Sequence, residues 1–139
     1  KLYDEQGVRR YYVGGALGVD MWAGELILRL KEQPGYGDIE LVVVLPFEGH
    51  DSKWDERSKR RMDFLLRMCS DCVVIGKEDC RESYIKRNCY MVDHADYLVA
   101  VYDNERNLRS GTMQTVRYAQ NKGITISFVN PDTATVTTN

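Results

Sequence analysis

Apolar residues alternate along this chain between short continuous runs and stretches with helical spacing. The clearest run covers residues 39–45 and predicts a strand that is buried on both faces of a parallel sheet. Shorter runs predict strands at residues 9–13, 72–75, 97–101 and 124–129. Helical spacing is clearest after Gly18, where an apolar stripe recurs at Val19, Trp22, Ala23, Leu26, Ile27 and Leu30.

Further helices are predicted at residues 52–68, 84–93 and 110–121. The first of these opens on a capping-box-like pair, Ser52 and Asp55, with Asp in place of the usual Glu. Residues 1–6 read as the last turns of a helix that Gly7 ends in the left-handed conformation. Nothing ahead of Lys1 caps that helix, so we expect residues upstream of this sequence.

The alternation of strands and helices predicts the α/β class. We expect a Rossmann-like, three-layer α/β/α arrangement with a mainly parallel sheet. Residues 1–131 are predicted to form a single domain, and residues 132–139 a loose polar tail rich in threonine.

Composition narrows the functional classes. The 139 residues carry a net charge of −2, which gives no overall basic footprint for nucleic acid. The longest apolar run, residues 41–46, falls far short of the roughly 18 residues that span a membrane, and no signal peptide is visible. We therefore expect a cytoplasmic protein with no membrane partner.

The four cysteines include one C-x-x-C pair, Cys69 and Cys72. Zinc would need a second close pair, but Cys80 and Cys89 are too far apart, so reduced core or surface thiols are expected. Neither His50 nor His94 has a partner at ligand spacing, and no catalytic triad is recognisable. We predict no metal site and no certain cofactor.

Ligands of open parallel sheets bind beyond the carboxyl ends of the strands. Three loops at this edge are therefore candidate binding segments, together with the segment that opens the helix at 110. Their candidate residues are Gly14, Gly15 and Gly18 after the first strand, Pro46, Phe47 and Glu48 after the second, Asp103 after the fourth, and Ser110, Gly111 and Thr112.

Two of these segments run directly into helix N-termini, whose free N–H groups and partial positive charge suit a phosphate. The alternative is that the glycines only form turns and Ser110 only caps a helix. Asp20, in the first helical turn, could contact a ligand hydroxyl or complement the helix dipole. The first loop lacks the G-x-G-x-x-G fingerprint and a following Gly-Lys-Ser/Thr, which disfavours a nicotinamide dehydrogenase and a Walker-type site.

Two helices carry polar groups that could reach a ligand. Arg87 and Asn88 could reach a phosphate or a base edge, or could belong to a solvated helix face. The predicted helix at 52–68 has six basic side chains near Trp54 and Phe64. Its acidic residues dilute that charge, so a solvated face is favoured over a nucleic-acid surface.

Four stretches resemble the SLOG superfamily, which includes the DNA-processing protein A and lonely guy families, and within it the bacterial YpsA-like family. They are GGALGVDMWAGE (14–25), LPFEGHDSKW (45–54), KRNCYMVDHADYLVAVYD (86–103) and SGTMQTVRYAQNKGI (110–124). The resemblance implies a Rossmann-like fold and a nucleotide-related ligand. It assigns binding to Gly15, Gly18 and Asp20, to Arg87 and Asn88, and to Ser110, Gly111 and Thr112.

The chain departs from these families in two places. Members of the YpsA-like family usually begin with a strand that ends in Thr-Gly-His-Arg. This segment is absent here, so the sheet is expected to lack an N-terminal strand and to leave a slot for pairing with another chain, such as a second copy. The lonely guy motif P-G-G-x-G-T-x-x-E has Thr115 where its Glu would be, which argues against transferring phosphoribohydrolase activity.

Three hypotheses follow. The first is a sensor or regulatory domain that binds ADP-ribose, a dinucleotide or a nucleoside monophosphate. The second is a nucleotide-processing hydrolase with Asp20, Glu48 or Asp103 as acid or base. The third is a single-stranded DNA binder, against which the acidic balance counts.

Overall fold

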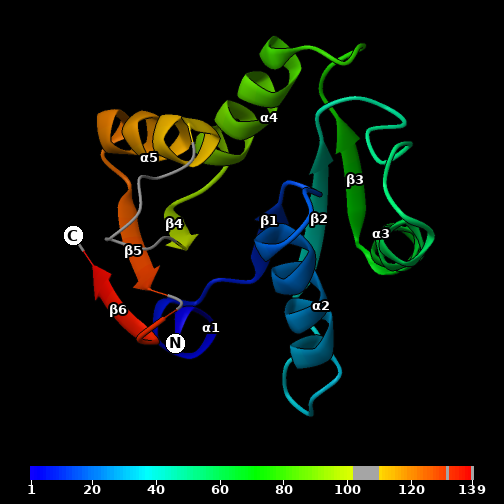
Figure 1. Cartoon of the computed structure of the whole chain (residues 1–139). Coiled ribbons are helices and arrows are strands. Elements are labelled where there is room, and N and C mark those ends of the chain that lie inside the picture. The colour runs from blue at the N-terminus through cyan, green and yellow to red at the C-terminus, as the bar shows by residue number, and fades with distance from the viewer. Residues whose placement is uncertain (102–109, 131, 139) are drawn as a thin grey trace. The chain divides into compact units, whose positions relative to one another are not determined.

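The chain folds into two compact units, residues Lys1–Asp79 and Cys80–Asn139. They are seen in a computed structural model that describes residues 1–101, 110–130 and 132–138, with the side chains of 110 and 111 left undescribed. Both units combine helices with parallel strand pairs (Figure 1). This confirms the predicted mixed α/β, Rossmann-like class.

The first unit is built on a parallel sheet in the order β1-β2-β3. Its strands are β1 (Arg10–Val13), β2 (Glu40–Leu45) and β3 (Asp71–Val74), and its helices are α1 (Leu2–Gln6), α2 (Val19–Lys31) and α3 (Glu56–Met68). Strand β2 is central, and its residues 41–45 are all buried, as its continuous apolar run predicted. Alternate side chains Leu41, Val43 and Leu45 pack with Met21, Met62 and Leu65 into one core.

The second unit pairs β4 (Tyr97–Val101) with β5 (Thr125–Asn130) in parallel. Helices α4 (Arg81–Asp93) and α5 (Ser110–Lys122) contact each other, and Val92, Val116 and Ala119 bury against Ala100 and Ile126. The predicted loose tail is wrong in part, because β6 (Thr135–Thr138) pairs antiparallel with β5. The Thr-rich segment has the β-branched side chains that suit a strand, although all four residues are exposed.

Helix α2 turns a different face to the core from the one that its apolar stripe predicted. Its buried residues are Met21, Gly24 and Leu28, while Trp22 is 59% exposed. Gly24 explains this, because a Cβ there would meet the side chain of Leu65 on α3 at 3.2 Å. The missing side chain lets the two helices approach closely. The apolar stripe then lies only half against the core, through Ala23 and Ile27.

Two helix starts also differ from the prediction. Helix α3 begins at Glu56 rather than at Ser52, because Asp55 is its N-cap and accepts a hydrogen bond from the backbone N–H of Ser58 at 2.9 Å. Helix α4 begins at Arg81, three residues earlier than predicted, with Cys80 as N-cap. The end of α1 agrees with its prediction, because Gly7 ends that helix in the left-handed conformation at φ 71°.

A bidentate ion pair ties α2 to α3. Arg61 donates from Nε and Nη2 to the two carboxylate oxygens of Glu25, at 3.0 and 2.5 Å. These hydrogen bonds hold the pKa of Glu25 below its ordinary value. The carboxylate therefore stabilises the folded state when it is charged, and this stabilisation is lost as the pH falls through the lowered pKa.

We expect Glu25→Gln to lower the free energy of unfolding by about 0.5–1 kcal/mol at neutral pH, a modest value because both side chains are partly exposed. The difference in the free energy of unfolding between Glu25→Gln and the unaltered chain should reach its full value above about pH 5 and should vanish toward about pH 3. Urea unfolding at several pH values measures it. Glu40→Gln is the matched control, because the Arg10–Glu40 pair is more exposed and should contribute less. A pH-independent loss in Glu25→Gln would contradict the assignment.

Candidate functional site

The loops that follow β1 and β2 leave the same edge of the first sheet. Val13 lies beside Val43 in the parallel register, so residues 14–18 and 46–50 emerge as neighbours. A direct contact joins them, because Nε2 of His50 lies 2.8 Å from the carbonyl oxygen of Gly15. A carbonyl oxygen only accepts, so this ring nitrogen is the donor.

Gly15 is glycine for two physical reasons. Its φ of 69° lies in the left-handed region, and a Cβ would come within 2.7 Å of Cδ2 of Leu45. The residue is buried, like Gly14 before it. Gly15 is therefore the point at which the first loop packs onto the end of β2.

The N-terminus of α2 is open. Its N-cap is Gly18, at φ 85°, and no side chain caps the helix. Apart from Gly18 and its chain neighbours, no atom of the described residues lies within 4 Å of where a Cβ of Gly18 would be, and the flanking Leu17 and Val19 are about half exposed. The first turn of α2 therefore receives no hydrogen-bond acceptor from its N-cap side chain, and the positive end of the helix dipole lies at Gly18.

Asp20 has a role that the sequence hypotheses did not include. Its Oδ2 accepts a hydrogen bond from the backbone N–H of Ala16 at 3.3 Å. The carboxylate therefore closes the glycine loop over the first turn of α2. It still lies beside the helix N-terminus, where its charge is stabilised by the dipole.

The second loop divides into a buried and an exposed part. Pro46 and Phe47 are buried, and the carbonyl of Pro46 accepts from the N–H of Gly76 at 2.7 Å. Glu48 is exposed, and Gly49 turns the chain at φ 77°. Glu48 therefore points its carboxylate group into solvent-accessible space, while Phe47 belongs to the core.

Sequence reasoning missed His50 and Trp54 as parts of this edge. Their rings pack edge to face with centroids 5.1 Å apart, and Trp54 also packs against the core. His50 is separated from Gly15 by 35 residues, so no spacing in the sequence links them. The one available signal was its position at the end of the Pro-Phe-Glu-Gly loop.

Helix α4 of the second unit carries the next candidates. Arg87 is only 6% exposed, so it does not belong to a solvated helix face. Its Nε donates to Oδ1 of Asn88 at 2.8 Å, and its guanidinium lies 5.7 Å from the centroid of the Tyr84 ring. Keeping a buried guanidinium costs desolvation free energy, which makes Arg87 an unusual position on this helix.

Helix α5 begins at Ser110, as predicted, so Ser110, Gly111 and Thr112 form its first turn. Contacts from Gln114 Nε2 to Cys89 Sγ at 3.7 Å, and from Tyr118 to Asp93 at 2.7 Å, pack this helix along α4. The second unit therefore carries its candidates on two packed helices. Asp103 lies outside the described residues.

The cysteines are free thiols. Burial raises the pKa of both Cys69 and Cys72, so neither is an activated thiolate at neutral pH. In the part of the chain that the structure describes, no three His, Cys, Asp or Glu side chains are grouped to hold a metal ion. None of the described helices has both the length and the apolar character needed to cross a membrane.

Comparison with known proteins identifies the family of this chain. The YpsA family model, described as the YspA SLOG family, matches residues 1–134. A UPF0398 protein of Staphylococcus epidermidis is 24% identical over 104 residues, which cover 73% of this chain and 54% of that protein. A UPF0398 protein of Bacillus cereus is 29% identical over 104 residues, covering 73% of this chain and 55% of its own length. The chain spans about half the length of these curated relatives.

The close packing at Gly15 yields a stability prediction. Gly15→Ala combines left-handed strain with a forced shift of Leu45, so we expect it to lower the free energy of unfolding by about 2–4 kcal/mol. Gly49→Ala is the matched control, because its φ of 77° brings the strain without a steric neighbour, at about 1–2 kcal/mol. Urea unfolding of both variants measures the difference. Equal losses would show that Leu45 does not restrict the loop.

Proposed function

Because this chain belongs to the YspA SLOG family, we propose that it binds a nucleotide or nucleotide-derived ligand at the Gly14–Gly18 loop, as a sensor or regulatory domain. The ligand class is that of ADP-ribose, a dinucleotide or a nucleoside monophosphate. The observation that carries the proposal is the uncapped N-terminus of α2, which opens beside a tightly packed glycine loop. Such a terminus binds phosphate through its backbone N–H groups.

The surrounding residues take complementary roles in this proposal. Gly15 and Gly18 shape the loop, and Asp20 holds it closed through the N–H of Ala16. The exposed carboxylate of Glu48, on the adjacent loop, can accept hydrogen bonds from ligand hydroxyls. Gly14, Pro46 and Phe47 support the loops from the buried side.

The resemblance to the family also assigns ligand binding, within the second unit, to Arg87, Asn88, Ser110, Gly111 and Thr112. Asp103 is a candidate because it follows the fourth predicted strand. The burial of Arg87 supports a specialised role, because a solvated side chain at that position would avoid the cost of desolvation.

The residues favour a protein that binds its ligand without cleaving it. Thr115 occupies the position where the lonely guy motif has its Glu. A threonine hydroxyl cannot act as a carboxylate base near neutral pH, because its own proton is far too weakly acidic. A ligand that stays intact for hours with the protein, followed by chromatography, would fit a sensor, whereas its steady cleavage would indicate a hydrolase.

The binding test uses one exposed position. Leu17→Glu places a carboxylate beside the N-terminus of α2 and should repel a bound phosphate, whereas Leu17→Gln has nearly the same shape without the charge. We expect one of AMP, ADP-ribose and NAD to stabilise the chain by about 2.7 kcal/mol at 100 times its dissociation constant, as measured by thermal unfolding.

In Leu17→Glu the dissociation constant should rise about tenfold or more, and in Leu17→Gln it should change little. A short oligo-dT serves as the nucleic-acid arm. Steeply salt-dependent binding of that oligonucleotide alone would support the DNA-binding alternative. A ligand that binds both Leu17 variants equally would contradict the placement of its phosphate at α2.

A further inference from the structure

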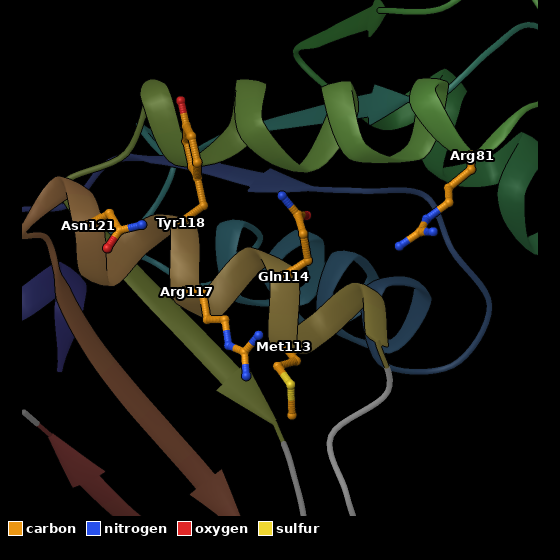
Figure 2. Close-up of a pocket in the computed structure, with 6 residues that line it drawn as sticks. All are labelled: Arg81, Met113, Gln114, Arg117, Tyr118 and Asn121. Atoms are coloured by element: carbon orange, nitrogen blue, oxygen red, sulfur yellow. The ribbon is translucent and has the colours of Figure 1, made fainter.

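A second concave surface lies on the second unit, along helices α4 and α5. It is a groove of about 420 Å³, lined by Arg81 from α4 and by Met113, Gln114, Arg117, Tyr118 and Asn121 from α5. Figure 2 shows Arg81 reaching from the beginning of α4 toward α5, and Gln114 and Tyr118 extending from α5 toward α4. This volume is within the range of roughly 300–1,000 Å³ that is typical of small-molecule sites.

Two arginines of the groove have no carboxylate partner within the described part of the chain. Arg81 and Arg117 are exposed and form no ion pair or hydrogen bond with any residue that the structure describes, whereas Arg9, Arg10 and Arg61 each pair with a carboxylate. The carboxylate of Asp93, which accepts from the groove residue Tyr118, is already neutralised by Lys122 at 3.2 Å. A guanidinium presents a fork of donors that fits a phosphate oxygen pair.

The side chain of Gln114 gives an independent indication that the groove accepts a ligand. Its Oε1 is buried and lacks a hydrogen-bond partner, the one such side-chain atom found among the described residues. Its Nε2 reaches only the sulfur of Cys89, at 3.7 Å, and sulfur is a weak acceptor. A buried polar atom kept unpaired costs stability, and such atoms in native proteins often mark a functional site.

We infer that this groove binds a small molecule that carries two phosphate groups separated by hydroxyl-bearing carbons. One phosphate pairs with Arg81. The other pairs with Arg117 and with the amide of Asn121, which lies one turn further along α5. A ligand hydroxyl donates to Oε1 of Gln114 when that side chain turns into the groove. Tyr118 and Met113 supply apolar surface for the carbon skeleton.

These residues are different from those of the glycine-loop site. The two assignments can therefore fail separately. Leu17→Glu should leave binding in the groove unchanged, whereas it should weaken a nucleotide at α2.

Isothermal titration of the 139-residue chain with fructose 1,6-bisphosphate tests the groove. We expect binding that weakens about tenfold or more in each of Arg81→Gln and Arg117→Gln, because each change removes a charge-assisted phosphate contact. Arg57→Gln is the matched control, an exposed arginine on α3 whose removal should leave the dissociation constant unchanged. Fructose 6-phosphate should bind more weakly than the bisphosphate.

Gln114→Leu separates a ligand-binding role from a structural one. Removing the unpaired oxygen should raise the thermal unfolding midpoint, while affinity for the bisphosphate falls. The inference is overturned if the bisphosphate does not bind, or if it binds both arginine variants as tightly as the unaltered chain. Citrate that binds as tightly as the bisphosphate would overturn the choice of phosphate over carboxylate.

Discussion

The parallel pairing of β1 with β2 is the constraint on which the first unit depends. Strand β2 is buried along residues 41–45 and hydrogen-bonds on both sides, so its backbone and side chains leave no freedom for a shifted register. The register places Val13 beside Val43, and from that pairing the two following loops emerge side by side. The contact between His50 and Gly15 is a consequence of that geometry and joins the loops into one surface. Membership of the YspA SLOG family is consistent with such a surface as the functional edge.

Gly15 and Gly18, in the same short loop, have different surroundings. Gly15 packs against Leu45, so its missing side chain is needed for the packing of the loop. Gly18 has no such close neighbour among the described residues, and its lack of a side chain leaves the beginning of α2 uncapped. A serine or aspartate at the N-cap would satisfy one free N–H group and stabilise the helix by about 1 kcal/mol. Without that cap the N–H group stays open to another acceptor, and the phosphate of the proposed ligand would supply one. Asp20 stabilises the conformation of this loop, because its carboxylate accepts a hydrogen bond from the backbone N–H of Ala16.

In the second unit, the polar side chains with unusual surroundings lie on the packed helices α4 and α5. Arg87 is buried. Among the described residues, Oε1 of Gln114 finds no hydrogen-bond partner, and Arg81 and Arg117 have no carboxylate partner. The buried Gln114 oxygen without a partner is unfavourable for folding, whereas the exposed arginines are solvated. Helices α4 and α5, which carry these residues, pack through Cys89–Gln114 and Asp93–Tyr118 contacts. The favourable part of the balance comes from the apolar cluster of Val92, Val116, Ala119 and Ile126, which holds α4 and α5 to the sheet.

Local pattern in the sequence determined the α/β class, most element positions, the buried character of β2 and the glycine loops at its edge, because period and turn chemistry act over a few residues. The glycine and Arg87 motifs were also visible in the sequence. Tertiary structure alone decided which face of α2 is buried, since that depends on Leu65 meeting Gly24 across two helices. It also decided that the Thr-rich tail pairs with β5, that Asp55 rather than Ser52 caps α3, and that His50 reaches Gly15. These outcomes depend on contacts between residues distant in sequence or on competition between neighbouring caps, and neither has a periodic signature.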